Sequence, residues 1–309
     1  MSEVVTAPAV SQRYDIAYLF DVKDGNPNGD PDMANTPRFD PETFQGLVSD
    51  VALKRKLRDY VYTLKSVTGA VEPGYDVFVL QGHSLESRQR MPYDNLASLA
   101  GKSGKTPPRD AIEQARAWMC EHFFDVRAFG AVMSTTEFNC GQVRGPVQIT
   151  FARSADRVFS TEHGISRVAY TTEKKHQETN SNTELGNKHT VAYGLYQAHA
   201  FVSPHLAMGP KGTGFNEADL DVLRQALVNM FDLDRSAARG LMQARGAVAF
   251  RHESPLGNAP AHTLFDRVRV EKREGVESPR RFEDYRVTVD EAGLPAGVTV
   301  EYWLDPRRG

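Results

Sequence analysis

The sequence contains very few cysteines and no long apolar run. Cys120 and Cys140 are its only cysteines, and they do not form a Cys-x-x-Cys pair. Two cysteines cannot build a disulfide framework, so we expect a reducing, cytoplasmic location. No apolar run is long enough to span a bilayer, and the N-terminus lacks the basic and apolar regions of a signal peptide. We therefore expect no membrane partner.

A net positive charge is also missing. The 309 residues carry 37 Lys and Arg against 40 Asp and Glu, which gives a formal charge of −3. This balance argues against a protein that coats nucleic acid without selectivity. Positive charge is instead clustered at residues 54–58, 101–109 and 267–273. Such clusters can bind phosphate although the whole chain is acidic.

Two segments partly match common ligand-binding motifs, but each lacks a residue that its motif requires. Asp24–Gly29 fits the opening of a calcium loop, but Asn35 stands at the twelfth position, where a bidentate Glu is needed. Gly101–Thr106 resembles a phosphate-binding loop, but Leu99 occupies the place of its first Gly. The histidines show no recognised metal spacing. We therefore expect neither a metal nor a cofactor.

The region from Tyr14 to Tyr60 carries the strongest pattern. Residues 14–22 are apolar and β-branched, which predicts a strand, and the Gly, Pro, Asn and Asp that follow predict a loop. A helix is then expected, with Ser49 as its cap; its apolar face would carry Leu47, Val51, Leu57, Val61 and Leu64. Asp50, Lys54 and Arg58 form a separate charged stripe. A helix start followed by cations suits an anion.

The remaining pattern predicts an α+β fold around a mostly antiparallel sheet. Ferredoxin-like folds, which include the RNA-recognition module, belong to this class. We expect strands at 75–81, 143–151, 191–202, 247–251, 264–270 and 298–304, and helices at 110–124 (capped by Asp110), 217–230 and 235–243. Residues 82–109 are polar and turn-rich, which predicts an inserted loop. Between the strands at 143–151 and 191–202 lies a polar excursion that should protrude.

Several separated motifs resemble one known family. NPNGDPDMANTPR and GLVSDVALKRKLRDYV, then FDVRAFGAVM, NCGQVRGPVQITFARSADRV and TNSNTELGNKH, follow one another in the order seen in the crRNA-binding backbone subunit of type I-C CRISPR Cascade. This is the Cas-seven family of the RAMP superfamily. The resemblance implies a modified RNA-recognition (ferredoxin-like) core with an inserted helical region and a protruding thumb hairpin. It divides the chain into a disordered tail at 1–12 and a single palm at 13–309, with insertions at 82–135 and 154–190.

The resemblance also implies which residues contact RNA. The loop and helix start would supply Asn26, Asn28, Ser49, Lys54 and Arg58. In the family, a Phe-Gly-x-x-Met turn places an apolar residue near a displaced base, and Met133 occupies that position. The following segment would add Gln142 and Arg144, and the thumb would add Leu185 and Lys188.

The implied role is non-catalytic. Several copies would polymerise along the crRNA guide and present it for pairing with target DNA in antiviral defence. The partners would be crRNA, target DNA, further copies of the chain, and the guide-end processing and large subunits. An alternative is a metal-independent RNA-processing endonuclease of the same superfamily, using His176 beside Lys174 and Lys175. A third is a small-molecule enzyme whose helix start holds a phosphorylated metabolite.

Overall fold

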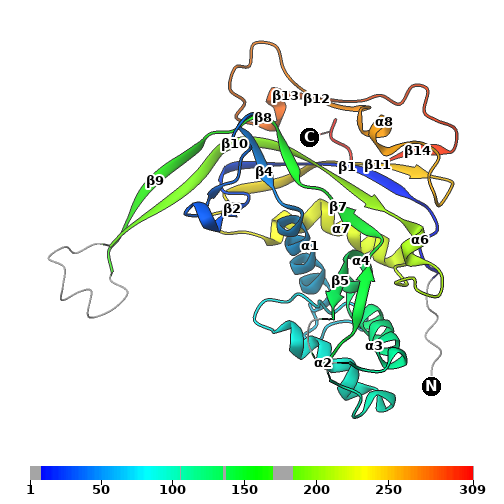
Figure 1. The fold of residues 1–309 in the computed structure, drawn as a ribbon. Coiled ribbons are helices and arrows are strands. Elements are labelled where there is room, and N and C mark those ends of the chain that lie inside the picture. Colours follow the sequence, from blue (N-terminus) through cyan, green and yellow to red (C-terminus); the bar gives the residue numbers. More distant parts are fainter. Residues whose placement is uncertain (1–7, 105, 135–136, 170–183, 309) are drawn as a thin grey trace.

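An eight-stranded sheet forms the centre of the molecule in the computed structural model, which describes residues 8–104, 106–134, 137–169 and 184–308 (Figure 1). The strands run in the order β14-β11-β1-β10-β8-β4, and β7 and β9 also pair with β10. Every ladder of this sheet in the described residues is antiparallel. The bounds are β1 Tyr14–Gly25, β4 Gln45–Val48, β7 Val147–Ile149, β8 Ala152–Arg157, β9 Ser160–Arg167, β10 Glu184–Val202, β11 Leu241–His252 and β14 Val298–Leu304. The predicted mixed α/β fold with a mostly antiparallel sheet is confirmed.

Two long helices cover one face of this sheet. They are α1 (Asp50–Lys65) and α7 (Glu217–Leu233), and they lie side by side beneath β1 and β10 (Figure 1). Alternate residues of β1, among them Ile16, Tyr18 and Phe20, are fully buried against them. Each such side chain contributes roughly 1.5–3 kcal/mol when it leaves water. Residues 14–22 of β1 are buried on both faces of the sheet, and the even-numbered ones form the face that the helices cover.

The opposite face is covered only in part. The short helix α8 (Ala261–Phe265) and the two-stranded sheet of β12 (Val268–Lys272) and β13 (Tyr285–Val289) pack over β1, β10 and β11. Ala17 and Phe250 contribute to this second core. The remaining short elements are β2 (Gly29–Asp30), β3 (Thr36–Pro37), α6 (Pro204–Ala207) and the 3-10 turns η1 (Pro31–Met33), η2 (Ala97–Leu99) and η3 (Phe282–Asp284).

A helical insertion forms a lobe with a core of its own. It contains α2 (Leu85–Asn95), α3 (Arg109–His122) and α4 (Phe124–Phe129), followed by the ribbon of β5 (Gly130–Met133) and β6 (Gly141–Arg144). The lobe lies below α1 in Figure 1. Its helices and β5 fall within the range 82–135 expected for an insertion, whereas β6 lies beyond that range.

A long two-stranded arm projects away from the sheet (Figure 1). It consists of β9 and the first part of β10, paired from Thr161↔Thr190 out to Arg167↔Glu184. The side chains described along this arm are mostly exposed. The resemblance implied an insertion at 154–190 with its thumb at 160–190; residues 154–157 lie in the central sheet, and the arm begins at Ser160.

Three of the predicted elements are wrong. Residues 75–81 make one isolated bridge, from Asp76 to Phe123, since the Asp125 carboxylate accepts the N–H groups of Phe78 and Val79 at 2.7 and 3.1 Å. Part of the predicted loop at 82–109 is helix α2. Residues 235–240 turn, and the remainder of the predicted helix at 235–243 begins β11.

Smaller corrections concern the ends of elements. Leu47 lies in β4, and Val51 is 64% exposed, so neither belongs to the buried face of α1 that Leu57 and Val61 help to form. Helix α3 begins at Arg109 after Pro108, and Asp110 lies in its first turn. Val10, expected in a disordered tail, is fully buried, and its N–H donates to the Phe215 carbonyl at 2.9 Å.

Candidate functional site

The start of α1 is hydrogen-bonded to the preceding loop through the side chain of Asn28. Ser49 caps the helix, because its Oγ accepts the Ala52 N–H at 3.3 Å, as predicted. The backbone N–H and the hydroxyl of Ser49 both donate to Oδ1 of Asn28, each at 2.9 Å. Asn26 closes the other side of the loop, since its Nδ2 donates to the Asn35 carbonyl at 2.7 Å. Two of the predicted site residues, Asn28 and Ser49, therefore meet at this helix start, and Asn26 bonds within the loop.

A cavity of about 320 Å³ opens beside this start, and it is rich in cations. Its lining includes Asn28, Gly29, Arg38, Ser49, Val51, Arg55, Lys56, Asp234 and Arg239. Asp234 is the only carboxylate among the lining residues, and it pairs with both Lys56 and Arg239. The four cations exceed this one carboxylate, so the cavity favours an anion.

The exposure and the ion pairing of each cation determine whether a ligand can reach it. Arg55 is the most open, with 59% of its side chain exposed; it bonds Gln81 Oε1 at 3.1 Å and pairs with the half-exposed Asp59 at 3.6 Å. Arg38 pairs with Asp30 at 3.0 Å. Lys56 is buried against Asp234, and burial lowers the pKa of its ammonium group. Arg55 is thus the cation that a ligand reaches most directly, whereas Arg38 and Arg239, with 34% and 28% of their side chains exposed, are each paired with one carboxylate.

Lys54 and Arg58, predicted as phosphate contacts, are held within the protein. Lys54 pairs with Asp50 at 3.0 Å, and Arg58 Nε donates to the buried Asp125 carboxylate at 2.7 Å. Both cations lie over the ring of Phe129 in α4. The stripe predicted from their spacing therefore exists, but it joins α1 to the helical insertion and does not line the cavity.

The β5–β6 ribbon turns a different side chain outward than the one predicted. Met133, the last residue of β5, is fully buried in the core of the insertion. Val132, its neighbour, is exposed and stands opposite Gln142. Gln142 and Arg144 are both exposed. The ribbon therefore offers Val132, Gln142 and Arg144 to a ligand.

The two predicted arm residues lie on β10. Lys188 is exposed and stands opposite His163 in the ladder. Leu185 pairs with Ser166 in the register, and its side chain lies outside the described part of the structure. His176, Lys174 and Lys175, considered for catalysis, also lie outside the described residues.

Arg38, Arg55, Lys56 and Arg239 were not among the predicted site residues. Arg55 and Lys56 belong to the basic cluster at 54–58, so the composition indicated them without saying which way they point. Arg239 lies about 180 residues further on, and no local pattern connects it to the loop. It arrives there because Gly25, at the end of β1, allows the backbone of Arg239 to approach: a Cβ on Gly25 would lie 1.9 Å from the Arg239 carbonyl oxygen.

Comparison with known proteins assigns the chain to a family. Residues 12–290 match the family model described as CRISPR-associated protein Cas7. The chain belongs to this family. A Cas7 protein of Haloferax volcanii is 27% identical over 230 residues, which are 68% of this chain and 62% of that relative. The match thus spans less than two thirds of the relative's length.

Two solved structures resemble this Cas7-family chain more distantly. One is described as a CRISPR RNA-guided surveillance complex, pre-nicking, with 14% identity, a TM-score of 0.46 and coverage of 77% of this chain and 78% of the other. The second, a CRISPR RNA-guided surveillance complex, has 13% identity, a TM-score of 0.40 and coverage of 77% and 68%.

Metal-binding clusters and membrane-spanning helices are both absent from the described residues of this Cas7-family chain. No group of three or more His, Cys, Asp and Glu side chains is arranged to hold a metal ion in the part of the chain that the structure describes. Within the same residues, no helix combines the length and the apolarity that a bilayer crossing requires.

Proposed function

We propose that this Cas7-family chain is a non-catalytic, guide-RNA-binding backbone subunit of a type I-C CRISPR surveillance complex. The observation that carries the proposal is the cationic cavity at the start of α1, where Asn28 and Ser49 hold the loop beside Arg55 and Arg239. A capped helix start beside a cavity lined by four cations and one carboxylate is suited to the phosphates of a nucleic-acid backbone. The type I-C assignment rests on the N-terminal sequence motifs at 26–61.

The order of the core elements supports the same role. β1, α1, β8, β10, α7 and β11 follow one another as β-α-β-β-α-β, and their strands are neighbours in the sheet. This is the order of ferredoxin-like folds. We assign these elements to the modified RNA-recognition core and the β9–β10 arm to the thumb.

The contacts would be largely independent of the guide sequence. Phosphates would meet Arg55 and Arg239 in the cavity, with Asn26 and Asn28 positioning the loop. Gln142 and Arg144 on the ribbon and Lys188 on the arm would add outer contacts, and Val132 takes the apolar role assigned to Met133. A subunit that must accept any spacer needs contacts of this kind, because base pairing with the target reads the sequence.

Several copies would act together. One cavity offers few cations, so affinity would grow as further copies bind along one guide. A small net charge on each copy limits repulsion within the array. The partners of this assembly are crRNA, target DNA paired to the guide, further copies of the chain, and the guide-end processing and large subunits.

The test is guide-RNA binding as a function of salt. Arg55→Ala combined with Arg239→Ala should weaken binding and reduce the slope of log affinity against log salt by about 0.7 for each phosphate that the variant no longer neutralises. Arg286→Ala is the matched control, because Arg286 is an exposed arginine on β13, remote from the cavity. An unchanged slope in the double variant, with the control equally unaffected, contradicts the site. Sharp, His176-dependent cleavage of repeat RNA in EDTA contradicts the non-catalytic role.

A further inference from the structure

Strand β8 and its flanks present a regular stripe on the face of the sheet opposite α1 and α7. Ala152, Ser154 and Val158 are buried, and Ala152 and Val158 belong to the core beneath the helices. The odd-numbered residues from 151 to 159 alternate with them and are exposed. Because side chains of a strand alternate between faces, the exposed set shares one face. It reads Phe151, Arg153, Ala155, Arg157, Phe159.

The chemistry of this stripe is unusual for a free surface. Phe151 is 55% exposed and Phe159 is 72% exposed. Arg153 pairs with Asp40 at 2.8 Å yet remains 54% exposed. Arg157 is exposed and has no hydrogen-bond or ion-pair partner within the described residues. Two open rings therefore flank two open guanidinium groups along one strand.

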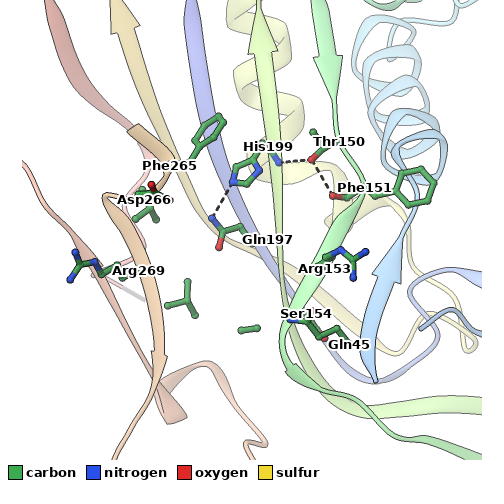
Figure 2. Close-up of a pocket in the computed structure, with 13 residues that line it drawn as sticks. Gln45, Thr150, Phe151, Arg153, Ser154, Gln197, His199, Phe265, Asp266 and Arg269 are labelled. Carbon is green, nitrogen blue, oxygen red and sulfur yellow. Dashed lines mark hydrogen bonds between the residues drawn. The ribbon is translucent and has the colours of Figure 1, made fainter. Parts of the chain in front are cut away.

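The stripe forms one wall of two successive hollows. The first has a volume of about 650 Å³ and lies between β8 and the segment from Phe265 to Val270 (Figure 2). The second, of about 390 Å³, continues along the same strand past Arg157 and Phe159, and β12–β13 form its other side. Charged residues lining the two hollows are Arg153, Arg157, Arg269, Lys272 and Arg280 against Asp156, Asp266 and Glu277. The two hollows therefore carry an excess of positive charge.

The floor of the first hollow offers neutral hydrogen-bonding groups. Gln197 and His199 project from β10 into it, and Figure 2 shows them side by side, with Arg153 and Arg269 on opposite flanks. The amide nitrogen of Gln197 lies 3.4 Å from Nε2 of His199. The His199 ring stacks on Phe265 with centroids 4.0 Å apart. An amide and an imidazole can donate to or accept from any base edge.

We propose that this face of the sheet is a second nucleic-acid surface, which binds a single strand other than the one held at the start of α1. Bases would stack on Phe151 and Phe159, and phosphates would meet Arg157 and the cations of the hollows. Exposed aromatic rings interleaved with arginines are the elements from which sequence-tolerant single-strand sites are built. The two sites lie on opposite faces of the sheet, so one subunit can engage both strands.

A second copy of the chain is the competing occupant. Interfaces between identical chains have apolar cores from which charge is depleted. Here two arginines flank the central Ala155 of the stripe, and the two phenylalanine rings lie at its ends. The observations therefore favour a nucleic-acid strand.

The experiment measures binding of a labelled, non-complementary single strand to the full chain, free and with guide RNA bound. Oligo-dT and oligo-U are compared, so that DNA and RNA are distinguished as the source. Phe151→Ala with Phe159→Ala should weaken binding at least ~5-fold for each ring that stacks a base. Arg157→Ala should lower the salt slope. Leu256→Ala, which removes another exposed apolar side chain, and Arg109→Ala, at an exposed arginine on α3, are the matched controls.

The cavity variant Arg55→Ala with Arg239→Ala keeps the two proposals separate. With guide RNA saturating the α1 site, it should leave binding of the second strand unchanged within about twofold, while the Phe variants leave guide binding unchanged. A Phe double variant that binds both oligonucleotides as tightly as the unmodified chain overturns the inference, even if guide binding behaves as proposed. Loss of self-association by sedimentation, with strand affinity unaltered, overturns it in favour of a contact between copies.

Discussion

Arg127 of α4 and Asp219 of α7 form a buried, two-bond ion pair that joins the helical insertion to the sheet. Arg127 Nε donates to Asp219 Oδ2 and Nη2 donates to Oδ1, each at 2.8 Å, and the Asp219 side chain is fully buried. The same carboxylate accepts the Asn216 N–H at 3.0 Å in the capping box of α7. The remaining Arg127 donors reach backbone carbonyls, including that of Gly74 at 2.9 Å. Arg127 thus links the insertion to α7, in addition to the Arg58–Asp125 pair that links it to α1.

Arg127→Met should destabilise the protein by about 3–5 kcal/mol, because it leaves a buried carboxylate without its counter-charge. Urea unfolding measures the free energy. The control is Arg235→Met, since Arg235 and its partner Asp232 are both largely exposed, and a surface pair contributes about 1 kcal/mol or less. A loss no larger than that of the control would show that the insertion does not depend on this pair.

Arg58→Ala and Arg55→Ala should have opposite consequences, although the residues are three positions apart. Removing Arg58 takes a charged hydrogen bond from the buried Asp125 and should cost about 1.5–3 kcal/mol of stability. Guide affinity of the folded variant should change less than twofold. Arg55→Ala should weaken guide binding and leave the urea midpoint in place. A reversed pattern would return the phosphate contact to Arg58.

Shortening the arm should leave the fold intact and impair assembly. Residues 162–189 can be replaced by an Asn-Gly turn, because Thr161 and Thr190 are paired across the ladder and such a turn closes two antiparallel strands. The described side chains in this part of the arm are mostly exposed, so little apolar burial is lost. We expect a melting temperature within a few degrees of the unmodified chain, and fewer copies on each guide by mass measurement. A large drop in melting temperature, or an unchanged copy number, contradicts this.

His199 should make stability fall as the solution is acidified. Burial lowers its pKa from the ordinary value of 6.5, so the unfolded chain takes up the proton first. Its stabilising contribution is complete above about pH 6.5 and is lost as pH falls through the folded pKa. The urea midpoint should therefore be lower at pH 5.5 than at pH 7.5. His199→Gln should reduce this difference, whereas the exposed control His262→Gln should not.

The local chemistry of the site could be predicted from the sequence. Ser49 follows a strand and precedes a helical pattern, so its capping role was evident, and Asn28 lies in a loop whose residues favour turns. The strands at 14–22 and 298–304 were also predicted, since a run of apolar and β-branched residues indicates a strand without knowledge of the strands that pair with it. The prediction of a strand at 75–81 was wrong because its backbone conformation depends on a distant residue. Its backbone donors are taken by Asp125, almost fifty residues away, and no local pattern reports such a bond.

The sequence by itself determined the strand, loop and capped helix at 14–60, because propensity and capping act over a few residues. It also determined that a polar segment protrudes after β8. Only the tertiary structure decided which cations line the cavity. Lys54 and Arg58 are neutralised by Asp50 and Asp125, while Arg239 is brought to the cavity by the close approach of its backbone to Gly25. The availability of a charge depends on the groups packed around it, and those groups come from distant parts of the chain.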